Sequence, residues 1–302
     1  MEIGLSLETN GTIDDVVERA TELAAAGART LWASQIFGWD TLTALAVVGR
    51  EVPGVRLGTA VVPVQPRHPV MLASQALAVQ SATGGRLILG IGLSHQIVIE
   101  NVFGMEWKRP ARYMREYLEI LGPVLRGEQV SFQGEVLRAN TFGPLETEGA
   151  EAPPVLVAAL GPEMLRIAAR LSSGTVTWMT GAATLAKHIV PTINREADAQ
   201  GMPPPQVVVH LPVCVTADPE GARERAGKIF SIYGQLPSYR AMLDREGVEG
   251  PSDLAIVGDD TQVVKAVNRV REAGATAFGA AVFGDSDERR RTIELIASLP
   301  EG

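Results

Sequence analysis

Residues Val55 to His95 read VRLGTAVVPVQPRHPVMLASQALAVQSATGGRLILGIGLSH, and this stretch decides the fold. Its first part, residues 56–62, is almost wholly apolar, which indicates a strand covered on both faces. Prolines 63, 66 and 69 delay a helix until residue 70, and Gly84-Gly85 ends that helix. Residues 86–91 are a second buried strand. Two buried strands joined by a helix must be parallel, and about 98% of such crossovers are right-handed.

The same junction, in which a helix ends at a glycine and an apolar strand follows, recurs along the chain. The predicted strands are residues 3–7, 30–33, 56–62, 86–91, 155–159, 175–179, 207–215 and 277–283. Eight strands that alternate with helices favour an α/β fold, a single (β/α)8 TIM barrel over residues 1–302. A doubly wound open sheet is the alternative if one strand has been miscounted.

Two longer connections interrupt the alternation, after the fourth and the seventh strands. Residues 96–110 show no sustained period, and long irregular loops in compact domains are often functional. Residues 130–137 suggest a small hairpin around Gln133-Gly134, and residues 141–154 a surface insertion. After the seventh strand we expect a helix that starts at Asp218-Pro219 and breaks near Pro237, then a short extended piece at 254–258.

Composition limits the possible partners and compartment. Hydrophobic residues make up 46% of the chain and charged residues 21%, and the net charge is −8. The longest basic run is residues 289–291, so we expect neither a nucleic acid nor a membrane as partner. The single cysteine, Cys214, excludes an internal disulfide, and no leader or spanning segment is evident, which together favour the cytoplasm. No His and Cys cluster has metal-ligand spacing.

Parallel βα units place their functional side chains where strands end and loops begin. His95 follows the strand end Gly92-Leu93-Ser94, and histidine can change protonation near neutral pH. It is therefore a candidate proton donor to a substrate atom that receives a hydride. The alternative is a histidine hydrogen-bonded to loop backbone. We expect His68 to be a loop anchor or a helix cap, and His188 and His210 to be structural.

Beyond these patterns, the chain resembles the bacterial luciferase-like monooxygenases, and within them the oxidoreductases that use the deazaflavin coenzyme F420. The resemblance covers nearly the whole chain. It rests on LWASQIFGWDTLTALA (31–46), VRLGTAVVPVQPRHPVMLASQ (55–75), GGRLILGIGLSH (84–95), VLVAALGPEMLRIAARLSSGTVTW (155–178) and VGDDTQVVKAVNRVREAG (257–274). It implies a TIM barrel, an F420 cofactor with FMN as the alternative, a small-molecule substrate, and a homodimer formed through the insertion after the fourth strand.

The resemblance also implies which residues bind the cofactor. A cis peptide would join Ala60 to Val61 in a bulge behind the tricyclic ring. Gln35 would hydrogen-bond the ring carbonyl or the substrate. The other positions implied to contact the ring are Ser34, Trp39 and Gly92. Trp39 could equally be core packing.

Phosphate binding is implied at a second place. Leu160-Gly161-Pro162 resembles the helix start that meets the cofactor phosphate, where free amides and the helix dipole attract an anion. The alternative there is ordinary strand-to-helix turn chemistry. Thr180 matches a position that bonds the cofactor chain. Arg290 is similar to an arginine that pairs with the phosphate, although a solvated helix start explains it equally.

This sequence departs from the related sugar-phosphate dehydrogenases. Those enzymes carry Asp-His where this chain has Ser34 and Gln35, Glu where it has His95, and a lysine where it has Ala183. Neither Ser34 nor Gln35 can take a proton at neutral pH, so dehydrogenase activity does not carry over. We therefore expect an F420-dependent reductase with His95 and Gln35 as its catalytic residues.

Three other functions stay open at this point. One is an FMN-dependent monooxygenase on the same fold. Another is a cofactor-free isomerase or lyase that acts on a phosphorylated compound, although no strand-end lysine supports it. The third is a relative that binds a flavin without catalysis.

Overall fold

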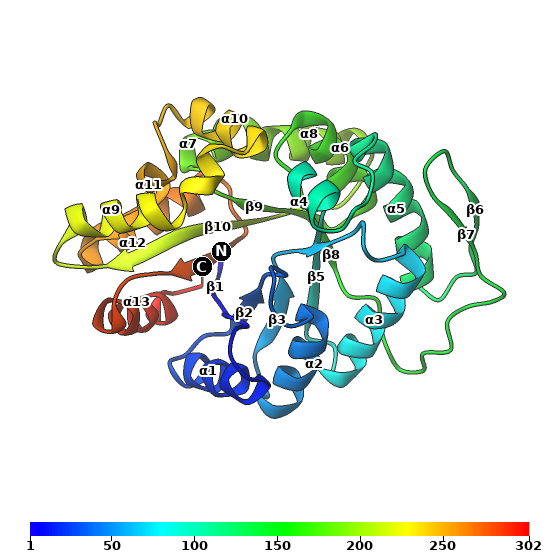
Figure 1. Ribbon diagram of the computed structural model, residues 1–302, viewed down its shortest axis with the longest axis horizontal. Coiled ribbons are helices and arrows are strands. Elements are labelled where there is room, and N and C mark those ends of the chain that lie inside the picture. Colours follow the sequence, from blue (N-terminus) through cyan, green and yellow to red (C-terminus); the bar gives the residue numbers. More distant parts are fainter. Residues whose placement is uncertain (302) are drawn as a thin grey trace.

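A computed structural model of the chain describes residues 1–301 (Figure 1). Eight parallel strands form a closed ring in the order β10-β12-β1-β2-β3-β5-β8-β9, and β9 pairs again with β10. These strands are β1 (Glu2–Ser6), β2 (Thr30–Ala33), β3 (Arg56–Thr59), β5 (Leu87–Gly92), β8 (Val155–Ala158), β9 (Gly174–Trp178), β10 (Gln206–Val215) and β12 (Ala277–Val282). The predicted (β/α)8 barrel is confirmed, and the open sheet is excluded.

Four further strands lie outside this ring. β4 (Val62–Pro63) continues β3 and pairs with β5, and β11 (Ile256–Gly258) pairs with the end of β10. β6 (Ser131–Gln133) and β7 (Arg138–Asn140) form an antiparallel hairpin that projects beyond α5 in Figure 1. The turn of this hairpin lies at residues 134–137, slightly later in the chain than the predicted Gln133-Gly134. The buried carboxylate of Glu116 holds it there, because it accepts hydrogen bonds from the amides of residues 135, 136 and 137.

Helices surround the ring (Figure 1). They are α1 (Ile13–Ala25), α2 (Thr41–Glu51), α3 (Pro69–Ala82), α4 (Gln96–Asn101), α5 (Pro110–Leu125), α6 (Pro162–Leu171), α7 (Ala182–Thr184), the π-helix η1 (Leu185–Ile189), α8 (Val190–Ala199), α9 (Pro219–Ile229), the 3-10 helix η2 (Ser231–Gly234), α10 (Pro237–Glu246), α11 (Pro251–Leu254), α12 (Asp260–Glu272) and α13 (Ser286–Ser298). None of these is long and apolar enough to cross a membrane.

Local sequence signals explain most helix starts. Thr12 and Asp15 form a capping box at the start of α1, and Asp40 caps α2 through the amide of Thr43. His68 caps α3, as expected. The expectation of an irregular loop over residues 96–110 was wrong for α4. Hydrophobic periodicity does not reveal this helix, because it is only six residues long and buries only Ile99.

Two aromatic rings pack perpendicular to each other inside the barrel. The indole of Trp32 and the imidazole of His210 are both buried and meet edge to face, with centroids 5.2 Å apart. A Cβ on Gly58 would lie 2.2 Å from the indole, and one on Gly279 would lie 2.3 Å from the imidazole. Glycines on neighbouring strands therefore make room for these rings. The structural role expected for His210 is confirmed.

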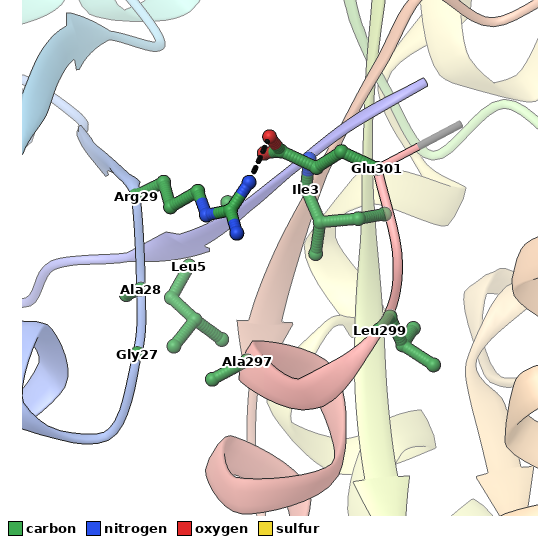
Figure 2. Close-up of a pocket in the computed structure, with 9 residues that line it drawn as sticks. Ile3, Leu5, Gly27, Ala28, Arg29, Ala297, Leu299 and Glu301 are labelled. Carbon is green, nitrogen blue, oxygen red and sulfur yellow. Dashed lines mark hydrogen bonds and ion pairs between the residues drawn. The ribbon is translucent and has the colours of Figure 1, made fainter.

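The amino-terminal end of the barrel carries a small pocket, shown in Figure 2. Glu301 accepts hydrogen bonds there from the guanidinium of Arg29 at 2.8 Å and from the amide of Ile3 at 3.3 Å. Aliphatic side chains such as Leu5 and Leu299 form the rest of the lining. This arrangement fastens Glu301 against β1 and the start of β2. It lies opposite the end where barrel enzymes place their chemistry.

Candidate active site

The segment that follows β3 lies at the carboxyl end of the barrel. The peptide bond between Ala60 and Val61 is cis, as the resemblance implied. The hydroxyl of Ser34 donates to the carbonyl of Ala60 at 2.7 Å, and the amide of Gln35 donates to the carbonyl of Val61 at 3.2 Å. The loop after β2 thus holds this segment through both of its carbonyls.

Small side chains meet next to this segment. A Cβ placed on Gly92 would lie 2.7 Å from Val61 Cγ2 and 3.2 Å from Ala158 Cβ, so the three residues converge. Ala60, Val61 and Ala158 pack on the inner layer of the barrel yet stay only half-buried. We call Ala60, Val61, Gly92 and Ala158 the rim floor. Its lack of bulky or charged groups suits the face of a planar ring.

His95 comes three residues after Gly92 of this floor. It follows β5 and occupies the N-cap position of α4, but its side chain does not cap that helix. Within residues 1–301 neither ring nitrogen of His95 forms a hydrogen bond to the protein, so the backbone-bonded alternative is not what the structure shows. Burial lowers the pKa of His95 below its ordinary value of 6.5. The imidazole is therefore mainly neutral at pH 7.

A chain of aromatic rings connects His95 to the end of β9. His95 lies 5.6 Å from Tyr239 on α10, Tyr239 lies 5.2 Å from Tyr233 on η2, and Tyr233 lies 5.6 Å from Trp178, all measured between ring centroids. We call these four residues the aromatic bridge. Sequence reasoning missed both tyrosines, and Trp178 is half-buried. A cluster of aromatic residues between positions 230 and 239 was the available signal.

The loop after β2 uses its other polar groups internally. Gln35 Oε1 accepts from the amide of Thr41 at 2.8 Å, and its Nε2 donates to the carbonyl of Trp39 at 3.2 Å. Trp39 itself is 47% exposed and donates from its indole to the carbonyl of Gly11 at 2.8 Å. The structure therefore uses the amide of Gln35 to fix this loop and does not direct it to the rim floor, and Trp39 lies outside the core.

Two helix starts lie next to each other at the ends of β8 and β9. α6 begins after Gly161, and no side chain caps its first amides. At α7, by contrast, the carboxylate of Glu246 accepts from the amides of Ala183 at 3.1 Å and Thr184 at 2.7 Å. The start of α7 is therefore occupied by the chain itself, whereas the amides at the start of α6 can receive an anion.

The residues around these helix starts already have partners. The carbonyl of Leu160 is hydrogen-bonded to His188 Nε2 at 2.8 Å, which gives His188 its expected structural role. Pro162 is the first residue of α6. Thr180 is buried and donates its hydroxyl to the carbonyl of Trp178 at 3.2 Å.

Arg290 does not join this group. Its guanidinium pairs with Asp287 at 3.4 Å and Glu294 at 3.3 Å, along an exposed face of α13. α13 follows β12, and β9 and β10 separate that strand from β8 in the ring. The pairing of Arg290 with the cofactor phosphate stays a prediction; in the structure Arg290 and Gly161 lie on different sectors of the barrel.

Comparison with known proteins gives a consistent picture. A family model described as luciferase-like monooxygenase matches residues 1–277. A putative coenzyme F420-dependent oxidoreductase of Mycobacterium tuberculosis is 27% identical over 309 residues, which cover 94% of this chain and 85% of that protein.

Solved structures share the fold. The coenzyme F420-dependent tetrahydromethanopterin reductase of Methanopyrus kandleri superposes with a TM-score of 0.81 at 19% identity, covering 99% of this chain and 98% of that one. The oxygenating constituent of 3,6-diketocamphane monooxygenase from Pseudomonas putida, solved with FMN, gives a TM-score of 0.78 at 18% identity, covering 99% and 97%. The same barrel therefore occurs with either kind of cofactor.

Proposed function

This chain belongs to the luciferase-like monooxygenase family, and we propose that it is a coenzyme F420-dependent oxidoreductase that reduces a small organic substrate. The observation that carries the proposal is the rim floor. At Gly92 even a single methyl group would meet Val61 and Ala158, so glycine leaves the floor without a side chain at this position, where a tricyclic ring would lie. The similarity to proteins named as F420-dependent supports the choice of cofactor.

Two parts of the site would hold the cofactor. Ala60, Val61, Gly92 and Ala158 would support the ring, and the uncapped amides at the start of α6 would receive the phosphate. When bound, the reduced deazaflavin supplies the hydride. The chain contributes position, shielding from water and a proton.

His95 is the group that moves this proton. Reduction of a double bond adds one hydride and one proton, and the imidazole of His95 has no protein partner to release first. Because burial holds the pKa of His95 below 6.5, the ring gives up a proton readily once it has taken one from solvent. Ser34 and Gln35 position the floor and do not take part in proton transfer.

An FMN-dependent monooxygenase is the second candidate, because an FMN-bound monooxygenase shares the fold. Titration of cofactor-free protein with F420 and with FMN, followed by visible absorbance, separates the two. We expect a spectral change that saturates with F420 and weaker binding of FMN. Tight FMN binding without F420 binding would replace the first proposal with the second.

A further inference from the structure

Much of the carboxyl end of the barrel carries no charge, and the charged groups after β1, β10 and β12 form ion pairs, Arg289 with Glu8 and Arg225 with Glu288. Five segments that build it contain no charged residue: 31–39, 58–66, 155–162, 175–186 and 229–239. In the stretch 88–99, His95 is the only titratable side chain. A ligand that reaches the rim floor therefore meets backbone, small side chains and aromatic rings.

The charged groups that border these segments are mostly neutralised within the chain. Arg67 pairs with Asp40, and Arg289 pairs with Glu8 at 2.7 Å. The carboxylate of Glu246 accepts the hydrogen bonds of the free amides at the start of α7. Lys187 is exposed, more than one helical turn beyond the end of β9. An anionic ligand at the floor would be desolvated without a cation to compensate it.

Within the described residues, the surface around His95 is apolar and carries no group that would bind an anion. Tyr239 and Tyr233 meet edge to face and lead from His95 to Trp178. On the same two insertions, Ile97 of α4 is 60% exposed and Ile232 of η2 is 53% exposed. Aromatic faces and aliphatic groups of this kind bind planar apolar molecules through contact area and ring stacking.

Resting on the proposed function, we infer that the substrate is an uncharged, planar and largely apolar molecule, of the class of aromatic or conjugated cyclic carbonyl compounds. It packs against Tyr239 and Tyr233, next to His95. Phosphorylated or carboxylated substrates are selected against by the missing cation and by the carboxylate of Glu246.

A pair of fluorescent probes tests this class on protein without cofactor, with inorganic phosphate added in excess so that the open amides at the start of α6 are occupied in both titrations. 2-Naphthol is neutral at pH 7, and 2-naphthyl phosphate has the same ring with a charged group. We expect 2-naphthol to bind about tenfold more tightly or better in a fluorescence titration, because the phosphate must be desolvated unpaired. Equal or tighter binding of the phosphate would overturn the inference.

Substitutions of Tyr239 test whether 2-naphthol binds at the two tyrosines. Tyr239→Leu should weaken 2-naphthol binding about fivefold through loss of ring stacking, and Tyr239→Phe should keep it. Phe142→Ser, at a fully exposed phenylalanine on the insertion after β7, is the control and should change nothing. If folded Tyr239→Leu protein, checked by circular dichroism, binds 2-naphthol like the wild type, the tyrosines are not the binding surface and the inference fails.

This result is independent of the cofactor assignment. Protein that prefers 2-naphthol but does not bind F420 would refute the proposed function and leave the ligand class standing. Protein that binds F420 but prefers the phosphate probe would do the reverse.

Discussion

The imidazole of His95 and the phenol ring of Tyr239 lie 5.6 Å apart at an interplanar angle of 58°. The first belongs to the connection after the fourth barrel strand, and the second to the connection after the seventh. The two insertions of the barrel thus meet over its carboxyl end and build one side of the candidate site together.

Replacement of His95 tests proton transfer. His95→Gln should lower kcat of the reductive reaction at least about 100-fold, the usual contribution of a general acid. In the wild type, kcat/KM should rise as the pH falls and reach a plateau at low pH. The midpoint of this rise should lie below pH 6.5, because burial lowers the pKa of His95. In the variant this rise should be absent. His68→Gln, at a helix cap, is the control, and an unchanged pH profile in His95→Gln would remove His95 from the mechanism.

Gly92→Ala tests the rim floor. The added methyl group would meet Val61 and Ala158, so the floor must shift and F420 should bind about tenfold more weakly or worse, with a modest loss of stability. Absorbance titration measures the first effect and urea unfolding the second. Gly143→Ala, where a Cβ meets no atom within 4 Å, should leave both unchanged. F420 affinity equal to that of the wild type would place the ring elsewhere.

His210 should make the protein sensitive to acid. Burial lowers its pKa from 6.5 to about 4, so the unfolded chain takes up a proton at mildly acidic pH while the folded chain does not. The stabilising contribution is present above pH 6.5 and is lost as the pH falls toward 4. Linkage gives a loss of about 2 kcal/mol between pH 7 and pH 5. Urea unfolding of His210→Phe should show a pH dependence smaller by that amount, and parallel curves would contradict this account.

Glu116 should control the hairpin arm. Its carboxylate accepts three backbone hydrogen bonds from the turn between β6 and β7, which hold the pKa of Glu116 below its usual range although burial opposes this. Glu116→Gln removes the charge and turns an amide donor toward these N–H groups, at a cost of about 1–3 kcal/mol. Hydrogen exchange of residues 135–137 should accelerate. The exposed Glu119 on the same helix supplies the control, Glu119→Gln, which should leave that exchange unchanged.

From the sequence alone follow the number of barrel strands, their parallel arrangement, the cap at His68 and the position of His95 at a strand end. These follow from hydrophobic period, glycine and proline positions and capping residues, all of which act within one segment. The cis bond between Ala60 and Val61 was implied by resemblance alone, and the structure contains it.

Which side chains share the site follows from three-dimensional packing alone. It brought Tyr239 and Tyr233 to His95, filled the start of α7 with Glu246, tied Gln35 into its own loop and left Arg290 on the outer face of α13. Each of these depends on contacts or hydrogen bonds that compete across segments distant in the chain. No local period encodes that competition, because it is settled only when the barrel closes and the insertions pack over its end.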